Sequence, residues 1–219
     1  MVVRIDRRAA IGPKSESPLE RATRGGPIRS WKADNRSATD ADLLLSYGTP
    51  DPRADPSIQE IGALAPTMSW FRSQGNRFLE MISGVPLTRL AFGVVMSFPV
   101  KDREQGYKAL AKLLRLPIDA EGSSDLFYQI NRPRRVAVGS EEYSINRLSK
   151  WMVAQLSGLL LQGAGAESFA LLPTFVVKVE LDINTTPASD RRFDSGKAAQ
   201  MLECLEELAK EISTRGDIP

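Results

Sequence analysis

The sequence predicts an α+β fold with two layers, in which helices pack on one face of an antiparallel sheet. Two stretches, residues 89–98 and 175–184, alternate apolar with other side chains at the period of two that strands show. Such alternation is typical of an antiparallel sheet with one face on the core and one facing water. The last helical stretch has a single apolar stripe, so we expect the helices to cover one face only.

The first 27 residues differ in composition from the rest of the chain. They contain three prolines and three glycines among scattered charges, which is typical of irregular structure. Residues 1–32 carry eight basic and three acidic side chains, whereas the whole chain of 219 residues has a net charge of only +2. We therefore predict a basic irregular segment over residues 1–27 and a single, mildly acidic α+β domain over residues 28–219. A division of that domain near residues 84–86 is the alternative.

A hairpin and a helix are predicted next. Residues 28–33 and 43–47 have strand character and flank a polar stretch, which indicates a hairpin with a long loop. Asp55 is suited to cap a helix that begins at Pro56, because proline at the first helical position loses no hydrogen bond. This helix should be interrupted near Pro66.

The middle of the chain alternates strands with one further helix. Residues 89–98 place five apolar side chains on one strand face: Leu90, Phe92, Val94, Met96 and Phe98. Asp102 then caps a helix that Pro117 stops. Residues 126–131 and 143–148 are predicted as strands, whereas residues 149–161 suit either a continued strand or a helix.

The last part of the chain again predicts a strand followed by a helix. Residues 175–184 put Val177, Val179, Leu181 and Ile183 on one face. A cap at Asp194 or Ser195 starts the closing helix, which ends at Gly216. Seven apolar residues share one face of that helix: Ala198, Met201, Leu202, Leu205, Leu208, Ala209 and Ile212.

Composition excludes several kinds of catalytic site. The chain has no histidine and a single cysteine, Cys204, so Ser-His-Asp and Cys-His pairs, histidine-ligated zinc and cysteine-rich metal clusters are excluded. Residues 163–166, Gly-Ala-Gly-Ala, lack the third glycine of a dinucleotide loop and are predicted as part of a flexible connection. We expect no cofactor and no bound metal, and we interpret Cys204 as a small packing residue.

Two carboxylates stand on the polar face of the strand at 175–184. Glu180 and Asp182 are two residues apart and therefore project to the same side. Carboxylates so placed can bind Mg²⁺ or act as an acid and base pair, which raises the hypothesis of a hydrolase. Alternating lysines and carboxylates are also typical of a solvated sheet face, and we favour that interpretation.

A basic cluster with aromatic neighbours is the main candidate binding site. It lies around two similar triplets, Ile130-Asn131-Arg132 and Ile145-Asn146-Arg147, and its members are Tyr128, Arg132, Arg134, Arg135, Arg147, Lys150 and Trp151. If the two triplets lie on neighbouring strands, the arginines gather at one edge of the sheet. Such a set suits phosphate contact with base stacking, or the anchors of a protein interface. A solvated edge whose charges prevent strand pairing is the third interpretation.

Three segments resemble a sporadically distributed family of bacterial α+β proteins. They are residues 86–93 (Pro-Leu-Thr-Arg-Leu-Ala-Phe-Gly), 143–147 (Tyr-Ser-Ile-Asn-Arg) and 181–184 (Leu-Asp-Ile-Asn). The family is similar in carrying a strand with an Arg-aliphatic-Gly core, an Ile-Asn-Arg strand, and a Leu-Asp-Ile-Asp strand before a C-terminal helix. The resemblance spans residues 86–212 and implies the fold but no activity. Asn184 departs from the family's acidic position, which weakens a metal site there.

These observations lead to three functional hypotheses. The first is a non-enzymatic, cytoplasmic interaction protein that binds a protein partner, or a second copy of itself, through the Arg/aromatic edge or the N-terminal segment. The second is a nucleic-acid-binding protein that uses the same cluster and the basic arm. The third is the carboxylate-dependent or metal-dependent hydrolase. No apolar run approaches the roughly 20 residues that span a bilayer, and the single cysteine is typical of a cytoplasmic protein.

Overall fold

The computed structural model describes residues 2–7, 29–37, 40–47, 63–84, 87–156, 159–160, 169–170, 174–186 and 192–219. The helices are α1 Leu64–Met81, α2 Arg103–Leu114 and α3 Ser195–Arg215. The strands are β1 Val2–Arg7, β2 Arg29–Ser37, β3 Asp40–Tyr47, β4 Leu87–Val100, β5 Phe127–Asn131, β6 Arg134–Val138, β7 Glu141–Leu156, β8 Leu159–Leu160, β9 Phe169–Ala170 and β10 Thr174–Thr185.

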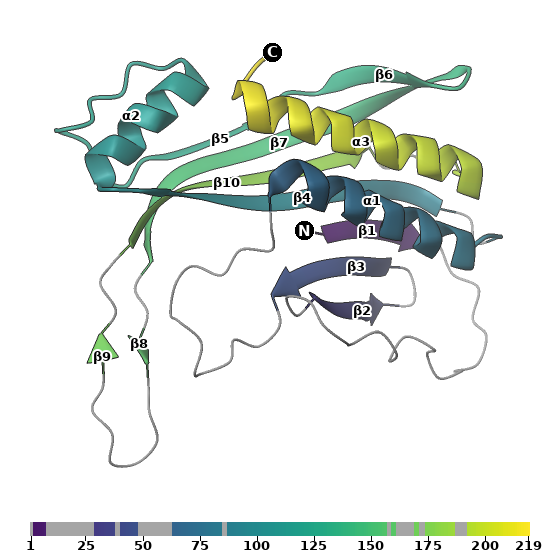
Figure 1. Ribbon diagram of the computed structural model, residues 1–219. Helices are drawn as coiled ribbons and strands as arrows, with labels where there is room; N and C mark the ends of the chain where they lie inside the picture. Colours follow the sequence, from purple (N-terminus) through teal and green to yellow (C-terminus); the bar gives the residue numbers. More distant parts are fainter. Residues whose placement is uncertain are drawn as a thin grey trace.

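Most of the described strands join one antiparallel sheet (Figure 1). Their order is β2-β3-β1-β4-β10-β7-β5, and β6 also pairs with β7. β8 and β9 pair with each other in a separate ribbon. The described helices lie together on one face of the sheet, where α3 contacts α1 and β4 and α2 contacts β10 (Figure 1). The predicted α+β architecture, with helices on one face of an antiparallel sheet, is confirmed.

The apolar faces of β4 and β10 meet the helices. Phe92 lies opposite Ile183 in the register, and Val94 lies opposite Leu181. All four side chains are buried, as the alternation along both strands predicted. Helices α1, α2 and α3 and strand β7 complete this core: Met68, Phe71, Tyr107, Leu110, Ile145, Trp151, Met201 and Leu205.

Local signals in the sequence fix where the helices begin and how closely they pack. The carboxylates of Asp102 and Asp194 accept hydrogen bonds from the main-chain nitrogens of the third residues after them, 2.8 Å away in each case. Gly75 lets α1 approach α3, because a Cβ there would lie 2.6 Å from Leu202 Cδ2. The caps predicted at Asp102 and Asp194 are therefore confirmed, and the stripe of α3 is buried on both the sheet and α1.

Residues 2–7 correct one prediction. They form β1, which pairs with β3 and β4, whereas the composition suggested an irregular segment over residues 1–27. The run is short and its partners are distant in the sequence, so no local pattern reveals the pairing. The rest of that segment lies outside the described residues. Because β1 pairs with β4, the sheet continues across the alternative division near residues 84–86.

Other expectations for single elements can be compared with the structure. The predicted hairpin is confirmed as β2 and β3, and both strands extend into the expected loop. Pro66 lies in the first turn of α1, where proline is tolerated. The helical part expected before it lies largely outside the described residues, so the interruption near Pro66 stays a prediction. In the stretch at residues 149–161, which suited either a strand or a helix, β7 continues as a strand to Leu156. Asp55, Pro56 and residues 163–168 lie outside the described residues.

Candidate functional site

The two Ile-Asn-Arg triplets do lie on neighbouring strands. Asn131 of β5 stands opposite Leu148 of β7, and the Arg132 nitrogen donates to the Arg147 carbonyl oxygen at 3.2 Å. The register nevertheless divides the predicted cluster between the two faces of the sheet. Five members of the cluster lie on the face toward the helices: Tyr128, Arg132, Arg134, Arg147 and Trp151. The other two, Arg135 and Lys150, lie on the opposite face.

Arg132 holds a single carboxylate, that of Asp217. Its Nε lies 2.7 Å from Asp217 Oδ1 and its Nη2 lies 2.8 Å from Oδ2, a bidentate pair. The Tyr128 hydroxyl donates to Oδ2 at 2.8 Å. The hydrogen bonds from Arg132 are the main cause that lowers the pKa of Asp217, and burial is the main cause that raises the pKa of Tyr128. This carboxylate is therefore ionised and fully engaged.

Arg134 and Arg147 bind the residues on either side of that contact. Arg134 donates to Glu211 Oε2 at 2.6 Å and to the main-chain oxygen of Pro219 at 3.0 Å. Arg147 is only 2% exposed, and its Nη2 lies 3.4 Å from the Ile218 carbonyl oxygen. Its desolvation lowers the pKa of the guanidinium group. We name Tyr128, Arg132, Arg134 and Arg147 the arginine clamp, and residues 216–219 the strap.

The strap begins at a position that only glycine fits. Gly216 has φ +80°, and a Cβ there would lie 1.9 Å from the Leu113 carbonyl oxygen at the end of α2. The Asp217 nitrogen donates to that same oxygen at 3.0 Å. Figure 1 shows the C-terminal end of α3 pointing toward α2. The strap therefore ties α2, α3 and the edge of the sheet together.

The face of the sheet opposite the helices, here called the open face, carries the other candidate residues. The register of β4, β10 and β7 aligns residues across these strands in rows. One row is Gly93, Asp182 and Leu148, and a second is Val95, Glu180 and Lys150. These side chains line a hollow of about 200 Å³. Because Gly93 contributes no side chain to its row, the hollow lies over β4 at this point.

The two carboxylates that suggested a hydrolase are paired on this face. Glu180 contacts Lys178 Nζ at 2.7 Å and Lys150 Nζ at 3.6 Å, and the hydrogen bond from Lys178 is the main cause that lowers its pKa. Asp182 accepts a hydrogen bond from the Asn184 amide at 3.0 Å. A carboxylate held ionised between two lysines is unsuited to donate a proton. Among the described residues, no group of three or more His, Cys, Asp or Glu side chains gathers.

A row of amides crosses three strands of the open face. Asn131 Nδ2 donates to Asn146 Oδ1 at 3.1 Å, and Asn146 Nδ2 donates to Asn184 Oδ1 at 3.1 Å. Asn184 then donates to Asp182, so the row runs without a break from β5 through β7 to β10. We did not predict this row. Its signal in the sequence is the asparagine in each of the two triplets and at the end of residues 181–184.

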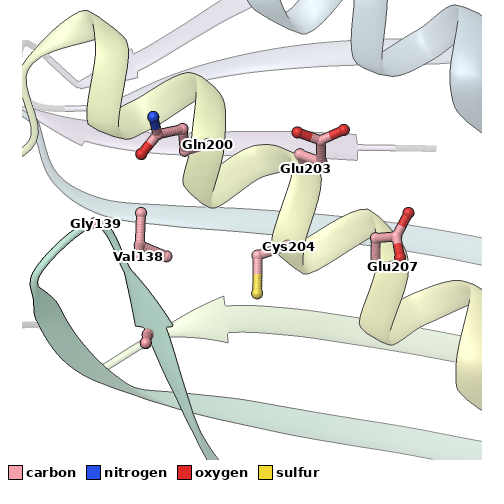
Figure 2. Close-up of a pocket in the computed structure, with 7 residues that line it drawn as sticks. Val138, Gly139, Gln200, Glu203, Cys204 and Glu207 are labelled. Atoms are coloured by element: carbon pink, nitrogen blue, oxygen red, sulfur yellow. The ribbon is translucent and has the colours of Figure 1, made fainter.

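A second groove lies between α3 and the β6–β7 turn (Figure 2). It has a volume of about 480 Å³ and is lined by Ala137, Val138, Gly139, Gln200, Glu203, Cys204 and Glu207. Burial, followed by the charge of Glu207, raises the pKa of the Cys204 thiol. The thiol is therefore protonated near neutral pH and is a poor nucleophile, in keeping with the prediction that it is a packing residue.

Comparison of this chain with protein-family models, curated proteins and solved structures finds no match. The resemblance to the bacterial α+β family therefore stays a prediction. In the described part of the chain, none of the helices is long and apolar enough to cross a membrane.

Proposed function

We propose that this chain is a non-enzymatic interaction protein that binds a protein partner through the open face of its sheet. The observation that carries the proposal is the exposure of apolar side chains on that face. Val95 and Phe127 are each 56% exposed there, although the described helices all lie on the opposite face. Val95 lies on β4 and Phe127 on β5, with β10 and β7 between them, and a sheet face that carries exposed apolar side chains without a covering helix is typical of an interaction surface.

The polar neighbours of these residues also support an interface. Phe127 stands opposite Met152 in the register, and Val95 stands in the row of Glu180 and Lys150. Exposed apolar side chains among paired charges and amides have the composition of a protein interface, in which the polar groups set orientation. The amide row holds β5, β7 and β10 in a fixed register, so the face is organised before a partner arrives.

The edge of the sheet at β5 and β6 is less suited to receive a partner strand. β5 and β6 have five residues each and are separated by Arg132 and Pro133. Short edge strands, proline and flanking charge are devices that discourage strand addition. The Arg135 side chain, 79% exposed beside Glu142, adds charge at this edge. We therefore assign the partner to the face and not to the edge.

The predicted cluster has two roles under this proposal. Arg132, Arg134 and Arg147 act inside the molecule, where they bind the strap. Arg135 and Lys150 are the members that lie on the open face. Within the described part of the cluster, Arg135 and Lys150 are the two residues that support the alternative, nucleic-acid binding. A cytoplasmic setting belongs to the proposal and is supported by the single cysteine of the chain.

Matched charge insertions test the proposal. Val95→Glu and Phe127→Glu place a carboxylate on the open face, and Met81→Glu does so at a residue of α1 that is 63% exposed. Each tagged full-length variant is used to isolate partners from the native host, with nuclease treatment, and bound proteins are identified by mass spectrometry. We expect one protein to be retained by the wild type and Met81→Glu and to be lost from both open-face variants.

Two results would contradict the proposal. Equal retention of every bound protein by all four chains would show that the open face makes no contact. Bound material that disappears on nuclease treatment and weakens steeply with salt would favour nucleic-acid binding instead.

A further inference from the structure

The arginine clamp has a buried hydrogen-bond donor that neither the strap nor α3 satisfies. The charges of Glu211 and Asp217 both act on Arg147, as do those of Arg132 and Arg134. Three guanidinium groups thus share two side-chain carboxylates, and Arg134 also donates to the main-chain oxygen of Pro219. Within the described structure, Arg147 Nε is buried and has no hydrogen-bond partner. A buried donor left in this state is costly, which is unusual in a contact whose only role is structural.

The strap fills the clamp through groups that any extended acidic peptide offers. One side-chain carboxylate, that of Asp217, accepts from Arg132 and Tyr128. Two main-chain oxygens, those of Ile218 and Pro219, accept from Arg147 and Arg134. Recognition of one carboxylate plus the adjoining main chain is the chemistry of a peptide-binding site.

The strap is attached to α3 by one residue of special conformation. Gly216 has a positive φ and ends the helix, and a single main-chain bond, from Asp217 to Leu113, ties the strap to α2. Beyond this bond the described hydrogen bonds of the strap are those with the clamp, and the Ile218 side chain is buried. Loss of the contact between Asp217 and Arg132 therefore removes the charged part of what holds the strap in place.

We infer that the arginine clamp is a receptor for an extended acidic peptide segment of a partner protein, and that the strap occupies it as a ligand in cis. Because the strap is tethered beside the clamp, it competes at an effective concentration in the millimolar range. A partner segment must therefore displace it, and weakening the strap should increase affinity for that segment. The clamp is on the helix side of the sheet, so this inference is independent of the open face.

Peptide binding to a strap-weakened chain tests the inference. The probe is a fluorescent, C-terminally amidated peptide of residues 211–219, Glu-Ile-Ser-Thr-Arg-Gly-Asp-Ile-Pro, and the control peptide has asparagine in place of its aspartate. We expect the full-length Asp217→Asn chain to bind the probe about tenfold more tightly than the wild type does, since one charge-assisted contact is lost from the competing strap. The control peptide should bind weakly, and Arg132→Gln in the same chain should abolish binding.

A second measurement keeps the wild-type strap. A fluorophore is attached at Pro219→Cys in a Cys204→Ser chain, and its anisotropy should fall when excess probe displaces the strap, but not with the control peptide. The inference is overturned if the anisotropy does not change, if the folded Asp217→Asn chain binds no probe, or if binding is independent of Arg132. An Asp217→Asn chain that fails to fold even with the probe would also overturn it, because the strap would then be an integral part of the fold.

Discussion

Removal of the Asp217 carboxylate should destabilise the protein substantially. Asp217→Ala deletes the acceptor of three hydrogen bonds, two from Arg132 and one from Tyr128, and leaves Arg147 buried with one carboxylate fewer. A hydrogen bond to a charged group contributes about 1.5–3 kcal/mol, and Arg132 regains part of its hydration in the variant. We therefore expect the free energy of unfolding to fall by about 3 kcal/mol, less than the 5–15 kcal/mol typical of a folded domain.

Urea unfolding at pH 7, followed by circular dichroism, measures this change. The midpoint should fall while the dependence on urea stays the same, because the unfolded surface is unchanged. A double-mutant cycle with Arg132→Ala should return a coupling energy of about 1.5–3 kcal/mol. A loss below about 0.5 kcal/mol, the usual range for surface substitutions, would refute the account of the clamp.

The pH dependence of the same pair of proteins provides a second readout. The folded protein lowers the pKa of Asp217, so the carboxylate contributes stability at pH values above its unfolded pKa of about 3.9. This contribution is lost as the pH falls through the lower pKa of the folded state. The difference in stability between wild type and Asp217→Ala should therefore shrink below about pH 4. A difference that persists unchanged down to pH 2.5 would contradict the assignment of Asp217 as the ionised partner.

Three further outcomes are expected. Arg72→Met removes one of the two cations beside the fully buried Glu206 carboxylate, the other being Lys210, and should cost about 2 kcal/mol in urea unfolding; a neutral result would contradict the ion pair. Gly216→Ala should cost at least about 2 kcal/mol, because the new Cβ meets the Leu113 carbonyl oxygen and φ is positive, and wild-type stability would show that the strap is not docked. Cys204 should react with a thiol reagent at pH 7 far more slowly in the folded than in the unfolded protein, and equal rates would disprove its raised pKa.

The parts of the fold that local patterns determine were predictable from the sequence. The alternation in β4 and β10 gives the buried face of each strand, and Asp102 and Asp194 mark the starts of α2 and α3. These features depend on residues close together in the sequence. β1 was missed because its pairing with β3 and β4 depends on contacts that no short window contains.

The candidate site was predictable in composition but not in arrangement. The repeated triplets correctly indicated neighbouring strands, yet the register places Arg132, Arg134 and Arg147 on the helix side and Arg135 and Lys150 on the open face. The decisive partner, Asp217, follows the helix-ending Gly216, and nothing in its local pattern indicates that it returns to β5. Long-range pairing of this kind follows from tertiary packing alone.

Side-chain footprinting of the protein with its captured partner tests the proposed interaction surface most directly. Hydroxyl-radical oxidation is compared between the free protein and the complex at Phe127 and Met152 on the open face and at Met81 on α1. The account predicts that Phe127 and Met152 are protected in the complex and that Met81 keeps its reactivity. Protection of Met81 with unchanged oxidation of Phe127 and Met152 would contradict it.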